Sequence, residues 1–241
     1  KENSDFQIAR SALIEGDATV LMIDFTLREE KQLPQGDVQS IAQMPMITGM
    51  ASAMTIENLT SIQDLMGSGG ESPQAAMENV PPSLQESLIF PYIGGLRFVL
   101  LAYQRLGSWQ KVDEIYAMAP VSTEQIIHPE RYFEKDMPVL IDFEISSALG
   151  GDWSEIYSNV MGEFQMHLTL KQHLRLLKKP GAPLPGINLP QAVEGWGGDK
   201  LFAFENKDKK VLVAHMSNWD TIEDAEQYYA AINGALARRF H

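Results

Sequence analysis

Apolar and polar positions along this 241-residue chain alternate mostly with the period of helices. Near the amino end, Phe6, Ala9, Leu13 and Leu21 recur at roughly helical spacing, which predicts one long helix over residues 4–30 with a buried stripe. Proline and glycine punctuation separates it from later apolar segments. Further helices are predicted over residues 56–66, 82–106, 109–118 and 153–177.

Shorter elements are predicted from capping and turn signals. Ser122 and Gln125 have the spacing of a capping box, so a short helix should begin there and stop before Pro129. Residues 139–143 have the composition of a short strand. Two β-forming runs then flank a polar turn at 206–209, which predicts a hairpin over residues 200–216.

A final amphipathic helix is predicted over residues 222–239, entered through Trp219-Asp220-Thr221. The predicted fold is therefore α+β and predominantly helical, with a helical bundle-like body and a C-terminal β-hairpin plus helix. Residues 1–179 would form the body, and residues 180–190, with four prolines and two glycines, would be a linker. Residues 191–241 would form a small subdomain packed with the body as one unit.

Charge and composition exclude several classes of protein. Nineteen basic and 32 acidic residues give a formal net charge of −13, whereas a nucleic-acid binder needs a basic surface to neutralise phosphate. The chain contains no cysteine, so disulfides and thiolate chemistry are excluded. No run of about 18 apolar residues is evident, so we expect no insertion into a membrane.

The segment Glu15-Gly16-Asp17 interrupts the first predicted helix with a glycine between two acids. Glycine inside a helix costs about 1 kcal/mol relative to alanine, and a buried carboxylate needs a partner. Either Glu15 and Asp17 lie on a polar helix face, or Glu15 binds a metal or a charged partner. The role of His128 also has two interpretations, because its side chain could interact with a helix dipole or be presented into a cleft.

Familiar catalytic motifs are missing from the chain. It has no Gly-x-Ser-x-Gly elbow, no glycine-rich phosphate loop and no His-Glu-x-x-His pair. Glu163 and His167 share a helix face four residues apart, which we interpret as a solvated pair. The residues themselves therefore do not define a complete catalytic site.

Residues 13–18, Leu-Ile-Glu-Gly-Asp-Ala, resemble the second metal-binding segment of gluzincin metallopeptidases, which often reads Leu-x-Glu-Gly-x-Ala. Nearly the whole chain is similar to a group of largely uncharacterised bacterial proteins with a zincin-like domain. The segments that carry this likeness are Phe90-Pro91-Tyr92-x-x-Gly95, residues 122–132 (Ser-Thr-Glu-Gln-Ile-Ile-His-Pro-Glu-Arg-Tyr), Gly195-Trp196-Gly197-Gly198-Asp199 and Trp219-Asp220-Thr221.

This resemblance implies a zinc-dependent peptidase acting on peptide or protein substrates, with zinc in the intact parent. Glu15 would be the third zinc ligand and Asp17 would support it. His128, with Tyr132 nearby, would stabilise the oxyanion of the substrate, a role inferred from position and residue type. The resemblance also mildly favours export or a periplasmic location.

In that family the His-Glu-x-x-His helix lies a few dozen residues upstream of the Glu-Gly-Asp-Ala segment, and the present chain begins after that point. We therefore expect this polypeptide to bind zinc poorly and to hydrolyse nothing. The alternative is a non-enzymatic protein-binding or scaffold module on a zincin-derived fold.

Overall fold

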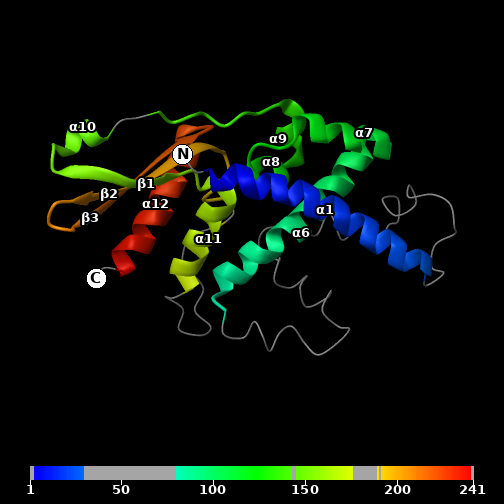
Figure 1. Cartoon of the computed structure of the whole chain (residues 1–241), viewed down its shortest axis with the longest axis horizontal. Helices are drawn as coiled ribbons and strands as arrows, with labels where there is room; N and C mark the ends of the chain where they lie inside the picture. Colours follow the sequence, from blue (N-terminus) through cyan, green and yellow to red (C-terminus); the bar gives the residue numbers. More distant parts are fainter. Residues whose placement is uncertain (1–2, 30–79, 143–144, 176–188, 190, 240–241) are drawn as a thin grey trace. The chain divides into compact units, whose positions relative to one another are not determined.

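The computed structural model of the chain describes residues 3–29, 80–142, 145–175, 189 and 191–239. Figure 1 shows that these residues form helices and a small sheet, so the predicted α+β, mostly helical fold is confirmed. The chain divides into two compact units. We call residues 8–136 the helical unit, and residues 1–7 with 137–241 the sheet unit.

The helical unit contains most of α1 and the described helices between residues 80 and 136. The buried apolar stripe predicted for α1 is present at Ala9, Leu13 and Val20. The helices among the described residues of this unit are α1 (Ser4–Glu29), α6 (Pro82–Leu106), α7 (Trp109–Asp113), the 3₁₀ helix η1 (Glu114–Met118), α8 (Thr123–Ile127) and α9 (Pro129–Glu134).

Helix α6 has the start and stop signals that the sequence predicts. Pro82 is the first residue of this helix, where a backbone N–H would have no intrahelical acceptor, so the N–H that proline lacks is not missed. Gly107 ends the helix in the left-handed conformation, with φ of 79°. By length and composition, residues 83–106 could cross a membrane, and 61% of the most apolar window in this helix is buried inside the protein. A buried core helix of a globular protein is also long, apolar and mostly buried.

Helices α1 and α6 cross at two glycines. A Cβ added to Gly16 would overlap the carbonyl group of Gly95, and one added to Gly95 would overlap the carbonyl oxygen of Ala12. The two backbones are therefore in direct contact, which only glycine permits. This contact is the structural explanation for the glycine in the middle of the first helix.

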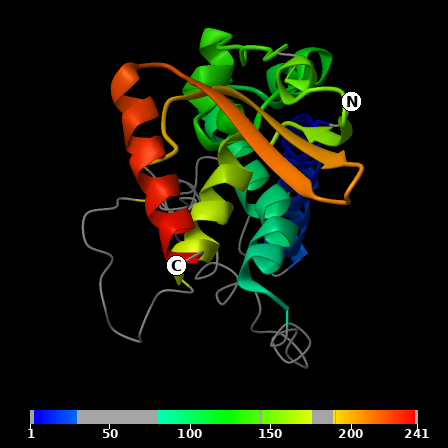
Figure 2. The ribbon, with the colours of Figure 1, turned by 90° about the vertical axis from the view of Figure 1, so that its left-hand side faces the viewer.

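The sheet unit is built on three antiparallel strands in the order β1-β2-β3, which are β1 (Trp153–Asn159), β2 (Trp196–Asn206) and β3 (Val211–Trp219). Helix α11 (Gly162–Arg175) contacts β2, and helix α12 (Ile222–Arg239) contacts β3. The two helices also contact each other, and they lie side by side in Figure 2. Their core contains Met166, Leu170, Ala192, Val193, Trp196, Tyr228, Ala231 and Ala235. A short helix, α10 (Ser146–Leu149), precedes β1.

The hairpin and the final helix confirm their predictions. Helix α12 begins with a reciprocal cap, in which the Asp224 amide donates to Thr221 Oγ1 at 3.2 Å and the Thr221 amide donates to Asp224 Oδ2 at 3.1 Å. The amino end of α1 is capped by Asn3, whose Oδ1 accepts from the Phe6 amide at 2.9 Å.

Two secondary-structure predictions are wrong. Residues 153–159 form β1 and not the start of a helix, because they pair antiparallel with residues 201–206 of β2, with a register shift between Glu155 and Tyr157. Residues 139–142 are not a strand, since Val139 makes one backbone bond to Gly197 in place of a ladder. Glu163 and His167 are also buried, at 3% and 1% exposure, and not solvated as we inferred.

The two units differ from the division predicted from the sequence. Their boundaries lie after residues 7 and 136, so that α11 belongs with the hairpin and α12. The predicted helix at 56–66 and most of the predicted linker at 180–190 lie outside the described residues. Within the sheet unit, the Ser4 amide donates to Asn159 Oδ1 at 2.9 Å, which attaches the first turn of α1 to the end of β1.

Candidate functional site

The two acids singled out on α1 have different surroundings. Glu15 is half-buried, and its backbone oxygen accepts from Thr19 Oγ1 at 2.6 Å. Asp17 Oδ2 accepts a hydrogen bond of 2.9 Å from the hydroxyl of Tyr116 on η1. Burial and the Asp17 carboxylate together raise the pKa of Tyr116 to about 12. Asp17 is thus engaged by a protonated phenol.

Glu15 does not by itself make a metal site. In the described part of the helical unit, no cluster of three or more His, Asp or Glu ligand atoms includes Glu15. A catalytic zinc needs three protein ligands, so Glu15 by itself does not form a zinc site.

His128 occupies the junction between α8 and α9, as the end of one helix and the cap of the next. Its side chain is 29% exposed, and Nδ1 lies 3.8 Å from Glu130 Oε1. The junction is held from α6, because Arg97 Nη1 donates to the carbonyl oxygen of Ile127 at 2.6 Å. Burial lowers the pKa of Arg97, while the charge of Glu130 acts in the opposite direction.

Tyr132 lies on α9, and its hydroxyl is engaged in a hydrogen bond within the protein. The hydroxyl donates to the carbonyl oxygen of Met118 at 2.9 Å, and the ring packs edge-on against Phe98 at a centroid distance of 5.4 Å. Burial raises the pKa of Tyr132, so the hydroxyl stays protonated. Asp17 and Tyr132, 115 positions apart in the chain, therefore both hydrogen-bond to η1, through Tyr116 and Met118.

The Ser-Thr-Glu-Gln segment before His128 is almost completely buried, with none of its four side chains more than 3% exposed. Ser122 Oγ caps α8 by accepting from the Gln125 amide at 3.3 Å. Gln125 Oε1 accepts from the Val121 amide at 2.9 Å, and its Nε2 donates to the Asp136 carbonyl oxygen at 2.5 Å. Much of this motif therefore serves to fix the chain around α8 and α9.

A groove in the sheet unit was not foreseen from the sequence. It has a volume of about 950 Å³ and runs between β3 and α12. Alternate residues of β3 face it, which is the period-2 pattern of a strand. These residues are Val213, His215, Ser217 and Trp219, and α12 contributes Ile222, Ala225, Glu226, Tyr228, Tyr229, Ile232 and Leu236.

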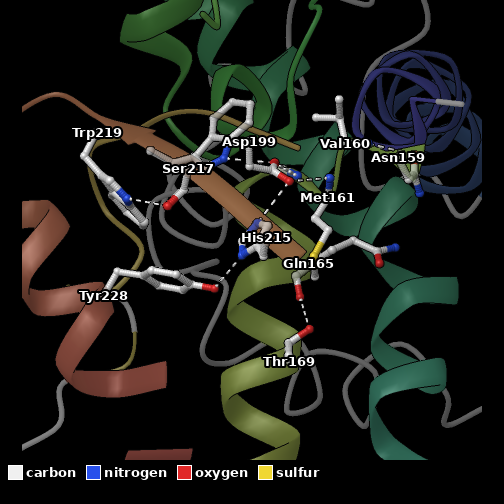
Figure 3. Close-up of polar contacts among 12 residues, drawn as sticks. Asn159, Val160, Met161, Gln165, Thr169, Asp199, His215, Ser217, Trp219 and Tyr228 are labelled. Atoms are coloured by element: carbon white, nitrogen blue, oxygen red, sulfur yellow. Dashed lines mark hydrogen bonds and ion pairs between the residues drawn. The ribbon is translucent and has the colours of Figure 1, made fainter. Parts of the chain in front are cut away.

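A buried carboxylate anchors the polar part of this groove, as Figure 3 shows. Asp199 on β2 is 2% exposed and accepts from the backbone amides of Met161 at 3.0 Å and Gly162 at 2.8 Å. These amides lie at the amino end of α11, where backbone N–H groups have no intrahelical partner and favour an anion. Trp196 Nε1 adds a third donor at 3.2 Å.

Asp199 orients His215, and His215 orients Tyr228. His215 Nε2 lies 3.2 Å from Asp199 Oδ2, and Nδ1 lies 3.3 Å from the Tyr228 hydroxyl (Figure 3). A carboxylate only accepts, so in the neutral imidazole Nε2 carries the proton and Nδ1 accepts from Tyr228. Burial and the charge of Asp199 raise the pKa of Tyr228, which keeps that hydroxyl protonated.

The sequence contained only a partial signal for this network. The segments Gly195–Asp199 and Trp219–Thr221 were noted for their likeness to a family, without any chemistry attached to Asp199. His215 is one of five histidines in the chain, and its alternation with Val213 and Ser217 could have placed it on one strand face. Nothing local indicated Tyr228 as its partner.

Comparison with known proteins gives a match to a family model. Residues 152–241 match the family described as Domain of unknown function (DUF8575), a region that contains Asp199, His215 and Tyr228. No curated protein and no solved structure matches the chain.

Proposed function

We propose that this chain is the carboxy-terminal part of a zinc-dependent peptidase of the gluzincin type, with Glu15 as one metal ligand. One observation supports it best: Asp17 and Tyr132, which lie in two of the segments that carry the resemblance, hydrogen-bond to the same 3₁₀ helix. The segments that carry Glu15 and His128 thus belong to a connected set of helices within one unit.

Each residue has a definite role in this proposal. Glu15 offers a half-buried carboxylate, and Asp17, together with Tyr116, fixes the turn of α1 that carries it. His128 is the candidate donor to a substrate oxygen. Tyr132 positions α9 through Met118 and does not itself donate to substrate, because its proton is engaged. Zinc would polarise the substrate carbonyl and lower the pKa of bound water to about 7.

The test uses the intact parent protein and measures zinc content together with peptidase activity. Glu15→Gln should abolish stoichiometric zinc, and Asp17→Asn should weaken zinc affinity by about 10- to 100-fold. Glu29→Gln, an exposed acid on the same helix, is the matched control and should keep both properties. If Glu15→Gln retains full zinc content, the ligand assignment is wrong.

The second candidate is a non-enzymatic protein-binding or scaffold module. It is favoured by apolar side chains exposed on the sheet unit, among them Val213 at 62%, Ile222 at 80% and Tyr229 at 70%. This alternative predicts that the intact parent has no His-Glu-x-x-His sequence and contains no zinc. Sequencing the upstream coding region distinguishes the two candidates.

A further inference from the structure

The groove of the sheet unit combines aromatic rings with negative charge. Trp219, Tyr228 and Tyr229 all line it. Among the described residues that line it, Glu226 is the one carboxylate, and neither lysine nor arginine is present. Its volume of about 950 Å³ is at the upper end of the range for small-molecule sites, roughly 300–1,000 Å³.

Two of the rings are held in place at their polar ends. Trp219 Nε1 donates to Ser217 Oγ at 2.9 Å, and the Tyr228 hydroxyl is bound by His215. The two rings pack at a centroid distance of 4.9 Å and an angle of 31°. Because their polar atoms are satisfied within the protein, the ring surfaces that remain accessible are suited to apolar or cationic groups.

Charge decides between possible head groups of a ligand. A carboxylate or phosphate head would meet Glu226 without a compensating lysine or arginine among the described lining residues, in a protein of net charge −13. An ammonium head would instead gain from Glu226 and from the faces of the aromatic rings. Electrostatic complementarity therefore favours a cation.

We propose that this groove binds an amphipathic organic cation, with an ammonium head near the aromatic rings and Glu226 and an apolar chain along α12. The lining positions from Ile222 to Leu236 extend over about 21 Å of helix, at 1.5 Å per residue, which accommodates an extended alkyl chain. The site lies entirely within the sheet unit, so it stands independently of the zinc-peptidase proposal.

The experiment titrates the full chain with three probes of equal chain length, namely hexyltrimethylammonium, hexan-1-ol and hexanoate, by calorimetry and amide NMR. We expect saturable one-to-one binding of the ammonium, about two- to fivefold tighter than the alcohol, since an exposed cation–π contact adds to the affinity. Hexanoate should bind more weakly than the alcohol.

Variants locate the site. Glu226→Gln should weaken hexyltrimethylammonium binding by about threefold and leave hexan-1-ol unchanged. Tyr229→Leu should also weaken hexyltrimethylammonium binding by about threefold, because it removes an aromatic ring that is 70% exposed. Glu223→Gln is the matched control, because it removes the same charge from an exposed position of α12 outside the groove.

Four outcomes would overturn the proposal. These are the absence of saturable binding of the ammonium, equal affinity for the alcohol, tighter binding of hexanoate, and equal weakening by Glu223→Gln and Glu226→Gln. The last outcome would mean that the overall field of the acidic protein, and not this groove, attracts the cation.

Discussion

Gly16 of α1 and Gly95 of α6 are in backbone contact, at a helix crossing with no room for a Cβ on either residue. This contact gives a structural reason for glycine in the middle of the Glu-Gly-Asp segment. The crossing also holds the turn of α1 that carries Glu15 and Asp17 directly against α6.

Replacing Gly16 with alanine should therefore destabilise the protein. Alanine gains about 1 kcal/mol in helix propensity, yet overpacking a tight core contact typically costs 1–3 kcal/mol, and here the obstacle is backbone. We expect a net loss of about 2 kcal/mol in the free energy of unfolding, measured by urea titration. Gly95→Ala should behave alike, since it meets the carbonyl oxygen of Ala12.

The control for this pair is Ala18→Gly, an exposed position on the same helix, which should lose about 1 kcal/mol from propensity alone. A gain in stability for Gly16→Ala would contradict the close crossing.

Tyr116 should titrate near pH 12 and not near pH 10. Between these values the folded protein keeps a proton that the unfolded chain has lost, so this contribution to stability is complete below about pH 10 and is lost as the pH rises through 12. Asp17→Asn should lower the pKa of Tyr116, because the acceptor charge is removed. Carbon-13 NMR of the tyrosine Cζ atoms measures this change, and an unaltered Tyr116 titration in Asp17→Asn would rule out the contact.

The Asp199 carboxylate should fix the tautomer of His215. In the unmodified protein at neutral pH, nitrogen-15 NMR should find the proton on Nε2 and Nδ1 accepting from Tyr228. Asp199→Asn should weaken this preference and reduce stability by about 3 kcal/mol, because buried donors lose a charged acceptor. Tyr228→Phe is the comparison, since it keeps the Asp199 contact and should leave the Nε2 tautomer in place. A proton on Nδ1 in the unmodified protein would contradict this network.

Gln125 should not tolerate an isosteric acid. In Gln125→Glu, an oxygen replaces the Nε2 donor facing the Asp136 carbonyl oxygen, so two acceptors meet in a buried site. We expect a loss of about 2–3 kcal/mol, measured by chemical denaturation. Glu130→Gln, which makes the reverse exchange at a side chain that is 58% exposed, should change stability by less than about 0.5 kcal/mol. Equal stability of the two variants would argue against the structural role of Gln125.

Local signals determined much of the fold. Helical periodicity identified α1 and α12, while Pro82 and Gly107 defined the ends of α6. Ser122 marked the start of α8. Each of these features depends on contacts within a few residues, such as a cap or a regular apolar stripe, so the sequence alone carries the information. The zinc, peptidase and partner expectations do not follow from such contacts and remain proposals.

Other features depended on which segments the tertiary structure brings together. Residues 153–159 form a strand because β2 supplies their hydrogen-bond partners, although most of their side chains are exposed and show no clear alternation. Glu163 and His167 have the spacing of a surface pair on a helix. The carboxylate of Glu163 and the imidazole of His167 are nevertheless both buried in the structure. Burial is a property of the whole unit and not of the helix pattern.

The same distinction applies to the candidate sites. The sequence drew attention to Glu15, Asp17, His128 and Tyr132 through motifs, but the use of the Tyr132 proton by Met118 became clear only from the fold. Asp199, His215 and Tyr228 come from β2, β3 and α12, and no spacing rule connects them. Only the tertiary structure brings them together, because hydrogen bonds act over about 3 Å in space regardless of separation along the chain.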